Sequence, residues 1–154
     1  MGVKSKFRSV SMSADLIAPC GINCALCSGY QRIKNTCPGC NALSGQPSYC
    51  RDCSIKMCSK KTETTQLCIE CSGYPCRRLK QLEKRYREKY GEHIFSSMEQ
   101  IQNEGIIHFL EREQTKWTCS CGELLCVHNE LCEHCGRKND FYIRTKKAET
   151  GRNC

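Results

Sequence analysis

Closely spaced pairs of cysteines constrain the fold of this 154-residue chain more than any other feature of its sequence. Of its 17 cysteines, eleven lie between Cys20 and Cys76 and five between Cys119 and Cys135. A gap of two residues lets one tight turn aim both sulfurs at a single tetrahedral ion. Five pairs have this gap and a sixth has a gap of one: Cys24/Cys27, Cys37/Cys40, Cys50/Cys53, Cys68/Cys71, Cys132/Cys135 and Cys119/Cys121. This repetition predicts a metal-binding protein.

A disulfide framework in a secreted protein is the main alternative explanation for so many cysteines. The first fifteen residues are polar and include Lys4, Lys6 and Arg8, so they do not form the apolar segment of an export signal. No run of eighteen apolar residues occurs anywhere, so a membrane span is not expected. We therefore expect a cytoplasmic protein, with no membrane contact, whose thiols are reduced and bind metal.

The remaining composition explains why such a chain would need metal. Without its cysteines only 43 of the 154 residues are apolar, which is little for a packed core. Bound ions can replace missing core energy, so the metal-free chain is expected to be largely unfolded. The formal charge of +8 assumes neutral thiols. About sixteen thiolates around about four divalent ions would offset most of that charge, which weakens it as evidence for nucleic-acid binding.

The chain divides into five predicted segments. We expect a disordered leader over residues 1–14, a cysteine-rich metal-binding module over 15–76, a helical segment over 77–116, a zinc-ribbon-like module over 117–137 and a basic tail over 138–154. Glycine and proline turns are dense up to Cys76, so only short elements are expected there. The predicted fold class is a small metal-stabilised α+β protein with an irregular multi-knuckle module, a central helical hairpin and a C-terminal zinc ribbon.

Two helical patterns follow Cys76. Apolar residues from Leu79 to Tyr90 recur every three or four positions, which predicts an amphipathic helix that Gly91 ends. The sequence 96–99 resembles a capping box, which predicts a second helix as far as Gly105 and its apolar continuation to about Gln114. Core positions are expected at Met98, Ile101 and Phe109, whereas His93 and His108 have no ligand partners nearby in the sequence.

The second cysteine block has the pattern of a zinc ribbon. Two knuckles, each followed by a glycine, are joined by a short apolar stretch. The predicted metal ligands are Cys119, Cys121, Cys132 and Cys135. Because the gap between Cys119 and Cys121 is shorter than usual, Cys126 and His128 remain alternate ligands.

The metal of the first block is left open between zinc and iron, since both accept four cysteines. We expect about three or four Zn²⁺ ions in the whole chain, with a [4Fe–4S] cluster in the first block as the alternative. The spacing Cys20-x3-Cys24-x2-Cys27 favours iron, and Cys76 is the expected fourth ligand of that group. The predicted ligands of the block are Cys20, Cys24, Cys27, Cys37, Cys40, Cys50, Cys53, Cys58, Cys68, Cys71 and Cys76.

Several motifs together resemble one protein family. They are the run Ile17–Tyr30 around Cys20-Gly21-Ile22-Asn23-Cys24, the knuckle Cys37-Pro38-Gly39-Cys40, the run Cys68–Cys76, and Trp117 with the following ribbon and Cys126-Val127-His128. The chain is similar over about residues 16–136 to an uncharacterised cysteine-rich family of bacteria and archaea, a domain of unknown function. The resemblance implies a prokaryotic cytoplasmic origin and metal binding, and it implies no reaction.

Function is predicted from these sites and from the motifs that are missing. The sequence has no catalytic triad, phosphate-binding glycine loop or metalloprotease motif, so catalysis is not favoured and no small-molecule substrate is evident. The leading interpretation is a structural zinc protein that acts as a scaffold for a protein partner. One alternative is an iron–sulfur electron-transfer or redox accessory protein. Another is a nucleic-acid-binding zinc protein, with Arg78, Lys84 and Arg85 as the contact residues.

Overall fold

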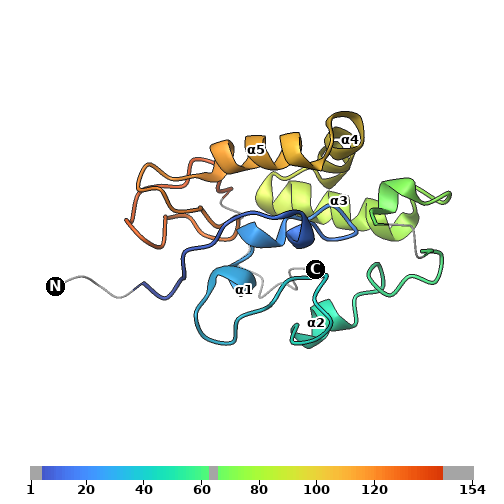
Figure 1. Cartoon of the computed structure of the whole chain (residues 1–154), viewed down its shortest axis with the longest axis horizontal. Helices are drawn as coiled ribbons and strands as arrows, with labels where there is room; N and C mark the ends of the chain where they lie inside the picture. The colour runs from blue at the N-terminus through green and yellow to red at the C-terminus, as the bar shows by residue number, and fades with distance from the viewer. Residues whose placement is uncertain (1–4, 63–65, 144–154) are drawn as a thin grey trace.

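The computed structural model describes residues 5–62 and 66–143, and these ranges are almost entirely helices and turns (Figure 1). The α-helices are α1 (Ser28–Gln31), α2 (Ser48–Arg51), α3 (Arg77–Tyr90), α4 (Ile94–Glu104) and α5 (Ile106–Trp117). Three 3-10 helices precede or separate them: η1 (Ala14–Leu16), η2 (Cys24–Leu26) and η3 (Cys68–Glu70). Within the described ranges β-pairing is limited to isolated bridges. The α+β class is therefore not confirmed, because the frequent cysteine turns leave no segment long enough to form a strand.

Helix α3 follows the sequence prediction closely. Leu79, Leu82 and Tyr86 are buried on one side of it, as the apolar spacing indicates. The helix ends at Gly91, which has a φ of +66°, a left-handed conformation that glycine adopts without steric cost. A side chain at this position would also collide with Ile143. Local sequence thus sets both the buried face and the end of α3.

Helix α4 begins three residues earlier than the capping-box pattern predicts, with His93 as its N-cap residue in place of Ser96. The carboxylate of Glu83, on α3, accepts a hydrogen bond from the backbone N–H of Phe95 at 3.2 Å and takes over the capping of the first turn. Ser97 instead donates its hydroxyl to the carbonyl of His93 at 3.2 Å. A tertiary contact therefore replaces the local cap, and α5 extends to Trp117 beyond the expected end.

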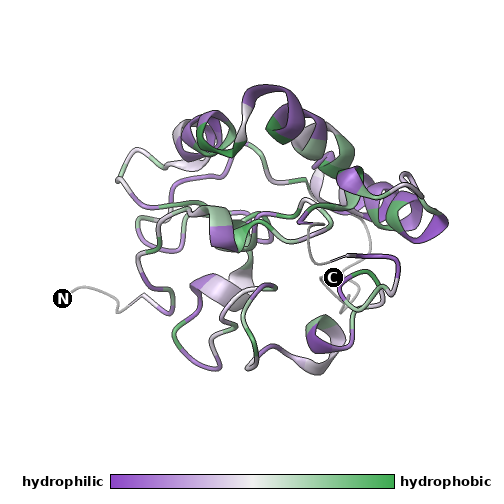
Figure 2. Ribbon diagram, turned by 45° about the vertical axis from the view of Figure 1, so that its right-hand side comes forward, coloured by the Kyte–Doolittle hydropathy of each residue, from purple (hydrophilic) through white to green (hydrophobic). Residues whose placement is uncertain are grey.

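The three long helices pack on the first cysteine block. Along α3, α4 and α5, hydrophobic and hydrophilic residues alternate as in amphipathic helices (Figure 2). Met98 and Phe109 are almost fully buried and Ile101 is buried, so all three predicted core positions are confirmed. This cluster also contains Ile17, Ala18, Cys20, Ile55 and Leu67 from the cysteine-rich segment. The helices thus supply the apolar surface that the cysteine turns lack.

A second buried cluster joins the two cysteine blocks. The indole of Trp117 is completely buried between Leu16, Ala25 and Leu26 of the first block and Leu124, Leu125 and Val127 of the second. The buried amide of Gln31 donates to the carbonyls of Ala25 at 2.8 Å and Leu125 at 3.0 Å. The segments predicted as separate modules, 15–76 and 117–137, therefore share one core.

The ends of the described chain are held more closely than the sequence suggests. Phe7 forms a β-bridge with Arg32, and the Arg8 guanidinium donates to the carbonyl of Tyr30 at 2.8 Å, in a stretch that the sequence predicts as disordered. Near the other end Asn139 is buried and donates to the carbonyls of Cys126 and Asn129, both at 3.0 Å. Residues 1–4 of the predicted leader and residues 144–154 of the predicted tail, which include Cys154, lie outside the described residues.

None of the helices in the described ranges combines the length and the apolar composition that crossing a bilayer would require.

Candidate metal centres

Four cysteines of the second block converge on one point. Two turns present them, each closed by a single β-bridge, Thr118 to Leu124 in the first and Leu131 to Lys138 in the second. The four sulfur atoms, which we call the ribbon group, all lie within 4.8 Å of one another and belong to Cys119, Cys121, Cys132 and Cys135. Cys119 and Cys132 are buried, whereas Cys121 and Cys135 are exposed. The group lies at the surface with one pair of ligands embedded in the core.

The spacing of these sulfurs matches that of ligands around one tetrahedral ion. A zinc–sulfur bond of about 2.3 Å places tetrahedral sulfurs about 3.8 Å apart. The Cys119 and Cys135 sulfurs are 3.6 Å apart, and the Cys121 and Cys132 sulfurs are 3.7 Å apart. Two pairs that bridge the two turns thus have nearly the required separation, so the ribbon group fits a single metal ion.

One thiol of the ribbon group, that of Cys119, has a lowered pKa, whereas the pKa values of the Cys121 and Cys132 thiols are raised. The N–H of Cys121 lowers the pKa of the Cys119 thiol to about 6, so this sulfur is mainly ionised at neutral pH. The same contact, from the N–H two residues further along to the sulfur, recurs at Cys20, Cys27 and Cys71. These four cysteines therefore share a backbone donor two residues further along the chain, which depends on the local turn.

The alternate ligands of the ribbon lie elsewhere. His128 accepts a hydrogen bond at Nδ1 from the backbone N–H of Ser28 at 3.1 Å, and its ring packs edge-on against Tyr90. Burial raises the pKa of the Cys126 thiol to about 12 and lowers the pKa of His128 to about 4, so both side chains are neutral at pH 7. Cys126 and His128 line the junction between the two blocks, and the ribbon group is complete without them.

A second set of cysteines, the central group, surrounds η2 in the first block. It consists of Cys20, Cys24, Cys27, Cys37, Cys40 and Cys53. The backbone N–H of Cys40 donates to the Cys24 sulfur at 3.5 Å. Burial raises the pKa of the Cys24 thiol to about 12, and the nearby thiols of Cys40, Cys27 and Cys37 raise it further. In the described part of the chain only the ribbon group brings three or more candidate ligand atoms within 4.8 Å, so the central sulfurs are neighbours at a wider spacing.

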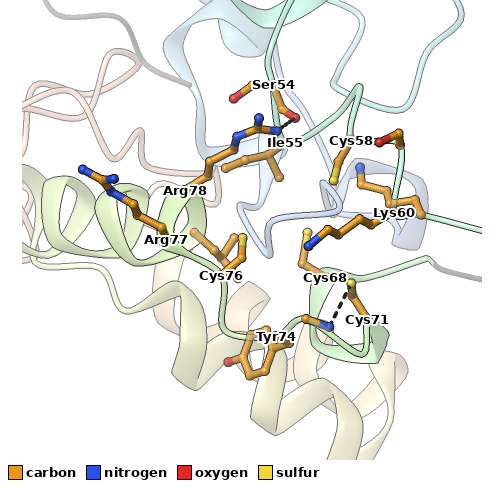
Figure 3. Close-up of a pocket in the computed structure, with 14 residues that line it drawn as sticks. Ser54, Ile55, Cys58, Lys60, Cys68, Cys71, Tyr74, Cys76, Arg77 and Arg78 are labelled. Carbon is orange, nitrogen blue, oxygen red and sulfur yellow. Dashed lines mark hydrogen bonds between the residues drawn. The ribbon is translucent and has the colours of Figure 1, made fainter.

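A third set, the pocket group, lines a cavity of about 350 Å³ beside the start of α3. It consists of Cys58, Cys68, Cys71 and Cys76 (Figure 3). The sequence predicts that Cys76 joins Cys20, Cys24 and Cys27, but Cys76 lies with the other cysteines of the pocket group. The thiols that interact with Cys20 are those of Cys40, Cys24 and Cys53. The prediction that Cys50 is a metal ligand is wrong, because Cys50 is disulfide-bonded and its sulfur is not available to a metal ion.

Four basic residues lie at the pocket group, and only Arg78 among them was predicted from the sequence, as a nucleic-acid contact. Lys60 and Lys61 follow Cys58 in the chain, and Arg77 and Arg78 follow Cys76, and all four line the cavity. The Nζ atom of Lys60 lies next to Gly73, on the opposite wall. The available signal was a pair of cations within three residues after a predicted ligand cysteine, in Cys58-Ser59-Lys60-Lys61 and in Cys76-Arg77-Arg78.

Comparison with known proteins agrees with the motifs of the first block. No curated protein and no solved structure was found to match this chain. Residues 16–81 match the family described as "Protein of unknown function (DUF3795)", a range that contains the central group and the pocket group and stops before the ribbon group. This part of the chain is therefore similar to a family whose description assigns no function.

Proposed function

We propose that this protein is a structural zinc protein that serves as a scaffold for a protein partner. The observation that carries the metal site is the ribbon group, whose sulfur–sulfur distances of 3.6 and 3.7 Å suit one tetrahedral ion. Zinc is the proposed metal because it accepts four thiolates in tetrahedral geometry and has no redox chemistry. The two turns with their short bridges support a zinc-ribbon-like module.

The ligand set supports a structural role for the zinc. Catalytic zinc keeps one position open for water or substrate, usually beside histidine or carboxylate ligands. Four thiolates leave no open position, and the two histidines nearest in sequence, His128 and His134, are not in the ribbon group. We propose one or two further ions at the six cysteines of the central group, which would bring the total to two or three, in a reducing compartment such as the cytoplasm.

Substitution of the two exposed ribbon ligands tests this proposal. Cys121→Ser and Cys135→Ser remove no buried side chain, so each is expected to lose one zinc per chain through lost ligation. The matched control is Cys126→Ser, which removes a thiol that was the alternate ligand and should keep the full zinc content. Elemental analysis of the purified variants gives the measurement. Equal zinc in all three variants, or loss only in Cys126→Ser, would show that the ribbon group does not hold the ion.

Exposed apolar side chains around α2 support a protein partner. Leu43 is fully exposed, Met57 is 69% exposed and Tyr49 is 39% exposed, and all three flank or belong to this short helix. Large apolar groups exposed close together in sequence are typical of an interaction surface. Nucleic-acid binding through α3 is the competing function, because Lys84 is exposed and Arg78 and Arg85 belong to the same basic helix.

Two variants, one with two substitutions and one with three, distinguish a protein partner from a nucleic-acid partner. Leu43→Asp with Met57→Asp is expected to abolish capture of a cell-extract protein by the immobilised chain, whereas charge reversal to Glu at Arg78, Lys84 and Arg85 leaves capture unchanged. Ile107→Asp, at an exposed position on α5, is the matched control. Salt-sensitive retention of RNA or DNA that only the charge reversals abolish would instead identify α3 as a nucleic-acid surface.

A further inference from the structure

We propose that the pocket group binds an iron–sulfur cluster, separate from the zinc of the ribbon group. Its four sulfurs belong to three different parts of the chain: the loop after α2, the η3 turn and the residue that precedes α3. Figure 3 shows the side chains of Cys58, Cys68 and Cys76 around a common space, with Cys71 at its lower edge. Four cysteines and an internal volume of about 350 Å³ thus occur together.

The spacing of the sulfurs favours a group of several atoms over one ion. The ribbon group shows that four thiols of this chain can be held at single-ion spacing. The pocket group does not reach that spacing, although its four cysteines line one cavity. In a four-iron cluster each thiolate binds a different iron, so the four sulfurs are farther apart than on one ion. Wide spacing around a cavity is what such a cluster requires.

The charges around the cavity also suit a cluster. Four thiolates and a four-iron core together carry net negative charge, which a surface pocket must compensate. Lys60, Lys61, Arg77 and Arg78 line the same cavity. The N-terminus of α3 adds its partial positive charge immediately after Cys76, which is the N-cap residue. The backbone N–H of Gly73 donates to the Cys71 sulfur at 3.4 Å, a contact of the kind that tunes cluster potentials.

The position of the cavity indicates how the cluster would be used. Cys76 is exposed and the other three cysteines are partly exposed, so the cluster would lie near the surface. A shallow cluster can exchange one electron directly with a carrier that docks on the basic rim. Its oxidised form would gain that electron and become more negative, and the four cations stabilise this reduced form.

Anaerobic reconstitution with ferrous iron, sulfide and a thiol reductant tests the proposal. The full chain is expected to bind about four iron and four sulfide atoms and to show brown visible absorbance that dithionite bleaches by one-electron reduction. Cys76→Ser, at an exposed position, should lose the iron and the absorbance and keep the ribbon zinc. Cys121→Ser should lose that zinc and keep the iron, so the two proposals can fail separately. A colourless reconstituted chain, or a zinc ion that Cys76→Ser removes, would overturn the cluster.

The basic rim provides a second, independent readout. Lys60→Gln removes one cation from the cavity and is expected to shift the midpoint potential of the cluster to a more negative value, because the reduced cluster loses a stabilising charge. Lys80→Gln is the matched control on α3, at an exposed position that does not line the cavity. Equal potentials in the two variants would contradict a cluster beside Lys60.

Discussion

Removal of the ribbon ion is expected to unfold the second block and to expose Trp117. Structural zinc contributes about 10–16 kcal/mol to the folding of small zinc domains, which is more than the whole stability of a typical domain of this size. Cys119 and Cys132 belong to the same buried cluster as Trp117. Loss of the ion therefore breaks the bonds that hold these two side chains in that core. Because Trp117 is the only tryptophan in the chain, its fluorescence reports on this region without interference.

Chelator titration under anaerobic conditions measures this effect. The emission of Trp117 should shift to longer wavelength as zinc leaves, and added zinc should restore the original spectrum. The Cys126→Ser variant, which keeps the complete ribbon group, is the control and should respond at the same chelator concentration. Emission that stays unchanged in protein shown by elemental analysis to be metal-free would mean that the ribbon group does not support the fold.

Trp117→Ala is expected to be the most destabilising single substitution outside the cysteines. Truncation of a buried aromatic side chain to alanine costs about 3–5 kcal/mol through lost burial and the cavity left behind. Trp117 has no exposed surface, and it contacts residues of both cysteine blocks within one cluster. The substitution should therefore loosen the two blocks together, as a single cooperative transition.

Urea denaturation followed by circular dichroism provides the measurement, since this variant has no tryptophan signal. Phe141→Ala is the matched control, because the Phe141 ring packs against Trp117 at a tilt of 54°, with centroids 5.0 Å apart, but Phe141 is 38% exposed. Phe141→Ala should lower the free energy of unfolding clearly less than Trp117→Ala does. Similar costs for the two variants, or separate transitions for the helices and the ribbon in Trp117→Ala, would contradict a shared core.

Features that depend on neighbouring residues could be predicted from the sequence. The buried face of α3, its end at Gly91 and the core positions Met98, Ile101 and Phe109 all follow from apolar spacing and glycine conformation. The start of α4 could not be predicted from the sequence, because the residue that caps its first turn is Glu83, which belongs to another helix. The missing strands have a related cause, since pairing of distant segments is decided by packing and not by the local pattern.

The sequence by itself determined that cysteine knuckles dominate this protein, because a two-residue gap creates the turn and its N–H···S contact within a few residues. It also predicted the four cysteines of the ribbon group, which lie within 17 residues of one another and whose sulfurs the fold brings together. Only the tertiary structure decided which knuckles share a site: it placed Cys76 with Cys58, Cys68 and Cys71, and it placed Cys126 and His128 at the junction of the two blocks. The physical reason is that a turn is closed by short-range geometry, whereas the assembly of several turns around one cavity depends on the helices and on the shared core at Trp117.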